Sequence, residues 1–165
     1  MRAGTRDRAL VYTMLFTGLR LSEAAGVELR DVAISERKGV IRLRPEVAKG
    51  GKQRDVPVPA AARKELSAYL ALRGGEPGRV FLGERGPIGR NGIARAIEKY
   101  ARAAGVGLSP HTLRHCYAYQ FLQTTSNDLV GLADVLGHSN LNTTRLYTKR
   151  RIEDLEAAVD GLDFA

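Results

Sequence analysis

The sequence has almost no cysteine and no long apolar run. Cys116 is the one cysteine among 165 residues, so no disulfide can form within the chain, and a reducing compartment is favoured. We expect Cys116 to be a small buried core residue rather than a reactive thiol. No apolar segment is long enough to cross a bilayer, and no secretory signal is visible at the start. We therefore expect a cytoplasmic protein without a membrane partner.

Acidic and aromatic residues are also few. The 18 Asp and Glu residues are outnumbered by 26 Lys and Arg residues, which gives a formal net charge of +8. A basic chain favours an anionic partner, and nucleic acid is the commonest one. Aromatic residues make up 6% of the chain and form no RNA-binding signature.

Helical and strand-like patterns follow one another in a simple order. Helices are expected over residues 6–16, from Ser22 as N-cap, and over 59–72, 89–104, 109 onward, 128–137, 140–147 and 151–159. Short strands are expected over residues 32–34, 39–43 and 54–58, and residues 83–87 are expected to be a loop. No repeat or domain boundary is visible. This order predicts a single α+β domain over residues 1–165, mainly helical, with a small three-stranded antiparallel sheet.

The chain's three histidines, His111, His115 and His138, fall between residues 109 and 147. Ser109 and Pro110 predict a helix start, with Ser109 as the N-cap. The free N–H groups of a helix N-terminus favour an anion. The helix start therefore places the first two histidines near a possible anion site.

Arg114 strengthens this anion site. It lies three residues after His111 on the same helical face, and its guanidinium offers a fixed fork of donors suited to phosphate. His138 and then Tyr147 follow along the chain. Two imidazoles, a guanidinium and a phenol near one anion predict phosphoryl transfer with a tyrosine nucleophile.

Five other tyrosines compete for the nucleophile role. Tyr117 and Tyr119 lie on different faces of their helix, so at least one of them is expected in the core. The remaining three fit helix-packing positions: Tyr12, Tyr69 and Tyr100. Tyr147 alone follows the last histidine and precedes a basic run.

Two other segments carry candidate cations. Gly18 permits a tight turn that leaves Arg20 between two helices, where Glu23 could hold its guanidinium; the alternative is a solvated surface arginine. Residues 49–52 predict a glycine-rich hairpin tip with two lysines, Lys49 lying nearer the strand. Such a lysine can reach into a partner's groove, and the alternative is an exposed solubilising turn.

Four segments together resemble the tyrosine recombinases, the phage-integrase family. The segments are TGLRLSE (17–23), AKGGKQRDVPVP (48–59), HTLRH (111–115) and LGHSNLNTTRLYT (136–148). They are similar to the family's first-arginine box, lysine hairpin, His-x-x-Arg box and second-histidine and nucleophile box. The resemblance runs from about residue 6 to about residue 150. It implies the fold of the family's catalytic domain; the additional helical DNA-binding domain that usually precedes it is not seen in this sequence.

The resemblance implies a site-specific recombinase or integrase that breaks and rejoins DNA through a 3′-phosphotyrosyl intermediate, without metal, ATP or another cofactor. Tyr147 would be the nucleophile. Arg20 and Arg114 would clamp the non-bridging phosphate oxygens, and Lys49 would protonate the leaving 5′-oxygen.

The remaining site residues are assigned on the same basis. His111 is the candidate general base, and His138 the candidate hydrogen-bond donor to the phosphate. Glu23 and His115 would support them. Further phosphate contacts are expected from four basic residues: Lys52, Arg54, Lys149 and Arg150.

The implied partner is double-stranded DNA, which suggests association with the nucleoid. The full-length protein is expected to form a homotetramer on paired sites, while the isolated domain could be a monomer. An apolar stripe within residues 151–165 would pack on a neighbouring subunit or on its own domain. The sequence leaves open whether the role is phage integration, transposition, cassette exchange or chromosome-dimer resolution.

Three other interpretations stay open. One is a DNA-binding relative without activity, and another is an enzyme like the type IB topoisomerases. The third is a zinc site at His111, His115 and His138. Zinc is disfavoured because the glutamate of a zinc-protease motif is missing and Arg114 would place a cation beside the metal.

Overall fold

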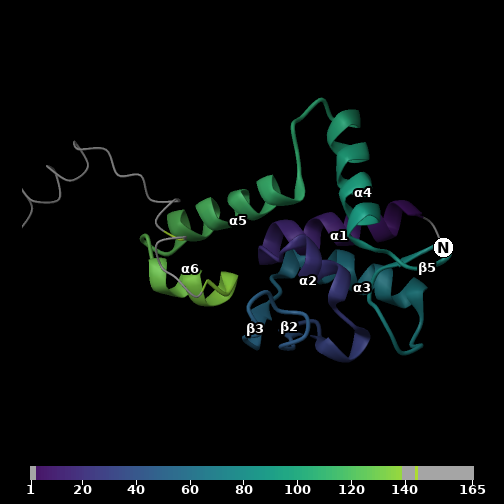
Figure 1. Ribbon diagram of the computed structural model, residues 1–165, viewed down its shortest axis with the longest axis horizontal. Coiled ribbons are helices and arrows are strands. Elements are labelled where there is room, and N and C mark those ends of the chain that lie inside the picture. Colours follow the sequence, from purple (N-terminus) through teal and green to yellow (C-terminus); the bar gives the residue numbers. More distant parts are fainter. Residues whose placement is uncertain (1–2, 139–143, 145–165) are drawn as a thin grey trace, which may run out of the picture.

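The computed structural model describes residues 3–138 and residue 144 (Figure 1). The helices are α1 (Ala3–Thr17), α2 (Leu21–Gly26), α3 (Ala60–Arg73), α4 (Arg90–Ala103), α5 (Pro110–Thr124) and α6 (Leu129–Leu136), with a 3-10 turn at Leu29–Asp31. The strands are β1 (Val32–Ile34), β2 (Gly39–Leu43), β3 (Arg54–Pro57), β4 (Leu82–Gly83) and β5 (Gly86–Pro87). The mainly helical α+β fold is confirmed. Of the helices predicted at 140–147 and 151–159, the structure describes Thr144, which is helical, and the other residues lie outside the described part.

Helix α1 lies at the centre of the main core. It packs against α3, α4 and α5, and Ala9, Leu10 and Met14 are fully buried. Leu113 of α5 joins this core. A smaller second cluster, which joins α5 to α6, consists of Ala118, Leu122, Leu132 and Leu136. Figure 1 shows α5 extending away from the body, with α6 folded back beneath it toward the sheet.

The three-stranded sheet has the order β1-β2-β3, with both pairs antiparallel. Ile41 of β2 is paired with Val56 of β3, and both are buried. The next pair, Arg42 and Asp55, points to the other face and forms an exposed ion pair of 3.2 Å. This alternation is typical of a sheet with one face on the core, and it confirms the predicted sheet.

A second, smaller hairpin forms where the sequence predicts a loop. Strands β4 and β5 are antiparallel, with Leu82 opposite Pro87. The buried Tyr69 anchors the segment, because its hydroxyl donates to the Val80 carbonyl (3.1 Å) and accepts from the Leu82 amide (3.0 Å). The prediction of a loop over 83–87 was wrong because two-residue strands leave no alternating pattern to detect.

The start of α2 also differs from the prediction. Ser22 is exposed inside the helix, and Arg20 occupies the N-cap position. The Glu23 carboxylate reaches back to accept a hydrogen bond from the Arg20 amide at 2.9 Å. This bond satisfies the amide of Arg20 and holds Arg20 at the helix entrance.

Helix α5 begins as predicted, and α6 begins and ends as predicted. Ser109 caps α5, its Oγ accepting from the Thr112 amide at 3.1 Å, and Pro110 is the first helical residue. Asp128 caps α6 through the Gly131 amide at 2.8 Å. Gly137 ends α6 in the left-handed conformation, with φ +63°.

Cys116 is exposed, so its predicted place in the core was wrong. The buried positions of α5 are Leu113, Arg114, Ala118 and Leu122. Cys116 falls on the opposite face, beside the half-buried Tyr117. Among the described residues, no helix combines the length and apolar character that crossing a membrane requires.

The turn at Gly18 generates the first prediction. Gly18 has φ +63°, and an added Cβ would lie 2.5 Å from Tyr117 Cδ1 and 2.8 Å from Leu136 Cδ2. Gly18→Ala therefore combines backbone strain with overpacking, and it should lower the free energy of unfolding by roughly 2–4 kcal/mol.

Gly105→Ala is the matched control. Gly105 has φ +67°, and nothing lies within 4 Å of its added Cβ, so only the backbone strain remains. We expect this variant to lose about 1–2 kcal/mol in urea denaturation. Equal losses in the two variants would show that the close packing at Gly18 contributes nothing.

Candidate active site

The carboxylate of Glu23 joins three segments that are distant in the sequence. It is fully buried and accepts hydrogen bonds from the Arg20 amide (2.9 Å) and Arg20 Nη1 (3.2 Å). Arg54 donates Nη1 to Oε1 (3.1 Å) and Nη2 to Oε2 (2.8 Å), and the Lys49 amide lies 3.4 Å from Oε1. Burial raises the pKa of Glu23, but the hydrogen bonds and charges of Arg54 and Arg20 outweigh burial, so its net pKa is lowered.

Arg20 and Arg114 converge on one oxygen atom. Arg20 Nη1 and Arg114 Nη2 each donate to the carbonyl of Leu136 at 2.9 Å. Arg114 Nη1 also donates to the Gly18 carbonyl, beside the turn that places Arg20. Leu136 is the last residue of α6, where carbonyl groups lack partners within the helix and the negative end of the dipole favours cations.

His138 lies directly beside Arg114. Its Nε2 is 3.0 Å from Arg114 Nη2, and its Nδ1 is 2.8 Å from Thr144 Oγ1, a buried hydroxyl. Since arginine can only donate, Nε2 must accept, and the proton of the neutral ring is on Nδ1. Burial first, then the charges of Arg114, Arg20 and Arg54, lower the pKa of His138 to about 4 against the opposing effect of Glu23. The ring is therefore neutral at pH 7.

His111 and His115 form a histidine pair at the start of α5. Their Nε2 atoms are 2.5 Å apart, and the rings meet edge to face. Burial, then His111 and Arg114, lower the pKa of His115. Within the described part of the chain, no group of three His, Cys, Asp or Glu side chains could hold a metal. His138, the third candidate zinc ligand, does not join this pair, because its Nε2 lies beside Arg114 Nη2 and its Nδ1 beside Thr144 Oγ1.

Lys49 lies in the loop between β2 and β3. Its side chain is exposed, while its backbone amide faces Glu23. Gly50 and Gly51 follow with φ +89° and +70°, and nothing lies within 4 Å of a Cβ added at either. Lys52 is also exposed. The loop thus exposes both lysine side chains, while the Lys49 backbone amide reaches the buried carboxylate of Glu23.

Arg54 lies within the fold, unlike the surface position expected of a phosphate contact. Its side chain is 10% exposed, and it bonds Glu23 and the Val135 carbonyl (2.9 Å). A DNA contact by Arg54 stays a prediction, but the observed contacts are internal to the protein. The structure therefore adds Arg54 to the site itself.

The chain's C-terminal part carries the remaining predicted residues. Tyr147, Lys149, Arg150 and the apolar stripe within 151–165 lie outside the described residues. The sequence reasoning missed Thr144 and the carbonyl of Leu136. Gly137 gave a usable signal for the latter, because the carbonyls before a helix-ending glycine need donors. Thr144 carries no comparable signal.

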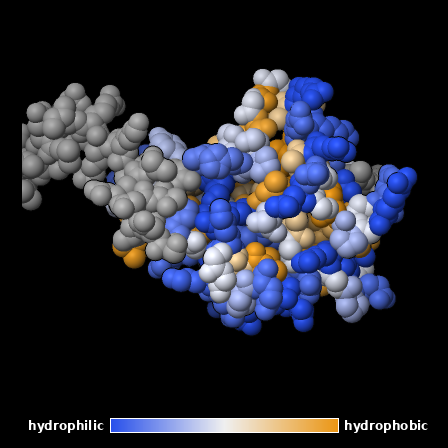
Figure 2. Space-filling view, in the orientation of Figure 1, coloured by the Kyte–Doolittle hydropathy of each residue, from blue (hydrophilic) through white to orange (hydrophobic). Residues whose placement is uncertain are grey.

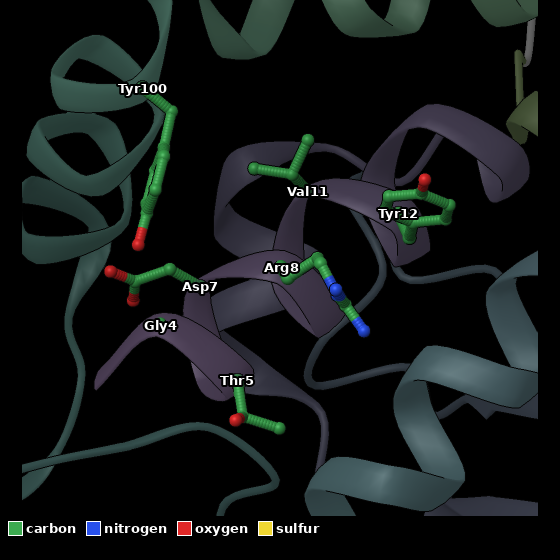
Figure 3. A pocket seen from close by; sticks show the side chains of 7 residues that line it. All are labelled: Gly4, Thr5, Asp7, Arg8, Val11, Tyr12 and Tyr100. Carbon is green, nitrogen blue, oxygen red and sulfur yellow. The ribbon is translucent and has the colours of Figure 1, made fainter. Parts of the chain in front are cut away.

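A separate hollow of about 490 Å³ lies between α1 and α4. In Figure 3 the Tyr100 hydroxyl points toward the Asp7 carboxylate across this hollow. Burial first, then Asp7, raise the pKa of Tyr100, which disfavours a reactive phenolate. None of the predicted site residues lines this hollow.

The comparisons with known proteins agree with this geometry. The sequence model of the Phage integrase family matches residues 1–153, and the chain belongs to this family. It is 37% identical over 162 residues to the tyrosine recombinase XerC of Pelobacter propionicus, covering 95% of this chain and 52% of that protein. The XerC of Pseudomonas aeruginosa strain LESB58 is 40% identical over 163 residues, covering 94% and 51%. The chain thus spans about half the length of these relatives.

A solved structure supports the same assignment. The XerH site-specific recombinase bound to difH substrate, in a pre-cleavage complex, superposes with a TM-score of 0.80 at 27% identity. The match covers 98% of this chain and 48% of that one. The fold is therefore that of the tyrosine recombinase catalytic domain.

The second prediction concerns His138. In NMR titrations its ring should stay neutral until the pH falls to about 4, with the proton on Nδ1. Because the unfolded chain binds this proton first, stability should fall as the pH drops from about 6.5 toward the folded pKa. His138→Asn should remove this part of the pH dependence. Titration at the usual histidine pKa, with the proton on Nε2, would contradict the bond from Arg114.

Proposed function

We propose that this chain is the catalytic domain of a site-specific DNA recombinase, which breaks and rejoins strands through a 3′-phosphotyrosyl intermediate. The observation that carries the proposal is the meeting of Arg20 and Arg114 at the Leu136 carbonyl, in a member of the Phage integrase family. Two guanidinium groups held 2.9 Å from one oxygen can also bracket the oxygens of one phosphate.

The chemistry is a transesterification at a DNA phosphodiester. The Tyr147 oxygen attacks phosphorus and the bond to the 5′-oxygen breaks, while Lys49 donates a proton to that oxygen. Attack by a 5′-hydroxyl on the phosphotyrosine reverses these steps and restores the diester. The energy of the bond is conserved in the intermediate, so the cycle needs no ATP.

Arg20 and Arg114 stabilise the charge that develops on the non-bridging oxygens. Each guanidinium carries its five N–H donors in a planar fork, which suits the oxygens of a phosphate. Arg114 is 6% exposed, and in such a poorly solvated place an aimed donor is worth about 10²–10³-fold in rate.

His138 and His111 divide the remaining roles. In the described geometry His138 accepts from Arg114, so it can donate to a phosphate only after Arg114 turns to that phosphate and Nε2 takes a proton. His111 is proposed as the base for Tyr147. Its neighbour His115 has a lowered pKa and so provides a neutral partner that can share a proton.

The other tyrosines fit the nucleophile role less well. Burial raises the pKa of both Tyr69 and Tyr117, which disfavours their phenolates. Tyr119 is 61% exposed and is not among the buried positions of α5, which include Arg114. These properties support Tyr147.

The wider context is proposed from the relatives. We infer that residues 1–165 act as one catalytic domain on double-stranded DNA, within a homotetramer on paired sites in the cytoplasm or nucleoid. The net charge of +8 suits a polyanion, and Figure 2 shows hydrophilic residues over most of the visible face. The structural relative XerH is itself bound to its difH substrate.

The third prediction tests the nucleophile. On a nicked suicide substrate that carries candidate core sites, the wild-type protein should form a covalent complex, and peptide mapping should place the DNA on Tyr147. Tyr147→Phe should form no such complex, because it lacks the attacking oxygen.

Tyr119→Phe is the matched control. It removes an exposed hydroxyl from the same chain and should leave covalent complex formation unchanged. A complex that persists in Tyr147→Phe would rule this residue out as the nucleophile.

The fourth prediction concerns the hairpin tip. Lys52→Ala should weaken DNA binding and reduce the salt slope by about one, because one phosphate contact is lost. Lys38→Ala is the control, since Lys38 is an exposed lysine at the opposite end of β2. The measurement is binding by fluorescence anisotropy across a salt series. Equal slopes for Lys52→Ala and wild type would remove Lys52 from the interface.

A further inference from the structure

We propose that Arg54 is a positioning residue, which keeps Arg20 available for the phosphate by holding Glu23 and the end of α6. This inference rests on the proposed function and deepens it. It gives Arg54 a different task from the phosphate contact expected from the sequence.

The contacts of Arg54 lead to two parts of the site. Its two Nη atoms form a bidentate pair with Glu23, at 3.1 and 2.8 Å, and its Nε donates to the Val135 carbonyl at 2.9 Å. The carboxylate is fully buried, and the Arg54 side chain is 10% exposed. Such a fork fixes orientation as well as charge, which a lysine cannot do.

The guanidinium of Arg54 also packs against bare backbone. A Cβ added to Gly137 would lie 2.6 Å from Arg54 Nη1 and 2.9 Å from its Cζ. Arg54 therefore contacts the residues on both sides of Leu136, and the Leu136 carbonyl is the shared acceptor for Arg20 and Arg114. By holding this turn of backbone, Arg54 sets where that acceptor lies.

Charge gives Arg54 its second effect. Arg20 Nη1 is shared between Glu23 Oε1 (3.2 Å) and the Leu136 carbonyl (2.9 Å). Without Arg54, the buried carboxylate would keep Arg20 as its one guanidinium partner among the described residues. The carboxylate would then draw Arg20 toward itself and away from a phosphate. Arg54 weakens this competition by donating to both carboxylate oxygens.

The opposite end of the same loop provides a matched control. Arg44 follows β2 directly, as Arg54 begins β3, and it pairs with Asp31 (2.8 Å) and Glu28 (3.1 Å). Neither acid contacts Arg20, Arg114 or His138 in the described bonds. Arg44 thus anchors the lysine loop without touching the site.

The fifth prediction compares Arg54→Gln with Arg44→Gln. The measurement is the single-turnover rate of covalent complex formation at saturating suicide substrate, with DNA affinity and thermal unfolding recorded in parallel. Arg54→Gln should cleave about 10²-fold more slowly, as expected when a clamping group is misplaced. Its DNA affinity should change little. Arg44→Gln should cleave at close to the wild-type rate, even if it unfolds at a lower temperature.

The pH profile separates positioning from simple destabilisation. Only ionised Glu23 competes for Arg20. Removing Arg54 leaves burial, which raises the pKa of Glu23, opposed by Arg20, so the defect of Arg54→Gln should shrink as the pH falls and Glu23 takes up a proton. Adding Glu23→Gln to Arg54→Gln removes the competing charge and should recover part of the rate and flatten the profile. The double variant also buries no unpaired carboxylate, so it keeps the test valid if Arg54→Gln fails to fold.

Three outcomes would overturn the inference. One is a full saturated rate in Arg54→Gln with a salt slope reduced by about one, which would make Arg54 a phosphate contact. Another is equal defects in Arg54→Gln and Arg44→Gln, and the third is no recovery in the double variant. If the wild-type protein forms no covalent complex, the proposed function fails instead. Arg54 is then tested by the backbone amide NMR signals of Gly137 and His138, which Arg54→Gln should shift and Arg44→Gln should not.

Discussion

The site depends on one buried carboxylate and the cations that surround it. A carboxylate as deeply buried as that of Glu23 is unfavourable unless it is paired and hydrogen-bonded. Its partners come from the entrance of α2 and the start of β3, and the backbone of the lysine loop completes the set. Removing one partner of such a pair typically costs about 3–5 kcal/mol. These segments therefore cannot separate independently, and their relative placement is fixed at the point where the chemistry is proposed.

Neutral acceptors hold most of the remaining positive charge. The carbonyls of Gly18, Val135 and Leu136 accept from the three guanidinium groups, and Glu23 is the one acid that the described bonds place among them. His138 is neutral, so three cations face one anion. Had acids held each arginine, the local field would have been cancelled. Helix-end carbonyls orient the donors and leave an excess of positive charge for a phosphate.

The sequence predicted those parts of the fold that local chemistry determines. Ser109 and Asp128 are caps because their side chains bond amides three residues ahead, and Gly137 ends α6 because it tolerates positive φ. The pairing of Arg20 with Glu23 follows from their spacing. Gly137 signals that the Leu136 carbonyl needs donors, but which donors meet there was not predictable, since that depends on how α6 packs on α5 and β3. The internal contacts of Arg54 were not predictable, because basic residues near a hairpin tip look alike until their neighbours are known.

The two kinds of cation in the site rest on different supports. Arg114 lies on α5 between Leu113, which belongs to the main core, and Ala118, which belongs to the second cluster. A helix fixed by two cores holds its side chain more firmly than a loop can. Lys49 instead lies in an open loop and is followed by two glycines. The two ends of this loop are held by the ion pairs of Arg44 and Arg54. In the proposed reaction, the guanidinium groups face charge that develops in one place, while the lysine donates to a leaving oxygen. Rigid support suits the first task, and an exposed loop held at both ends suits the second.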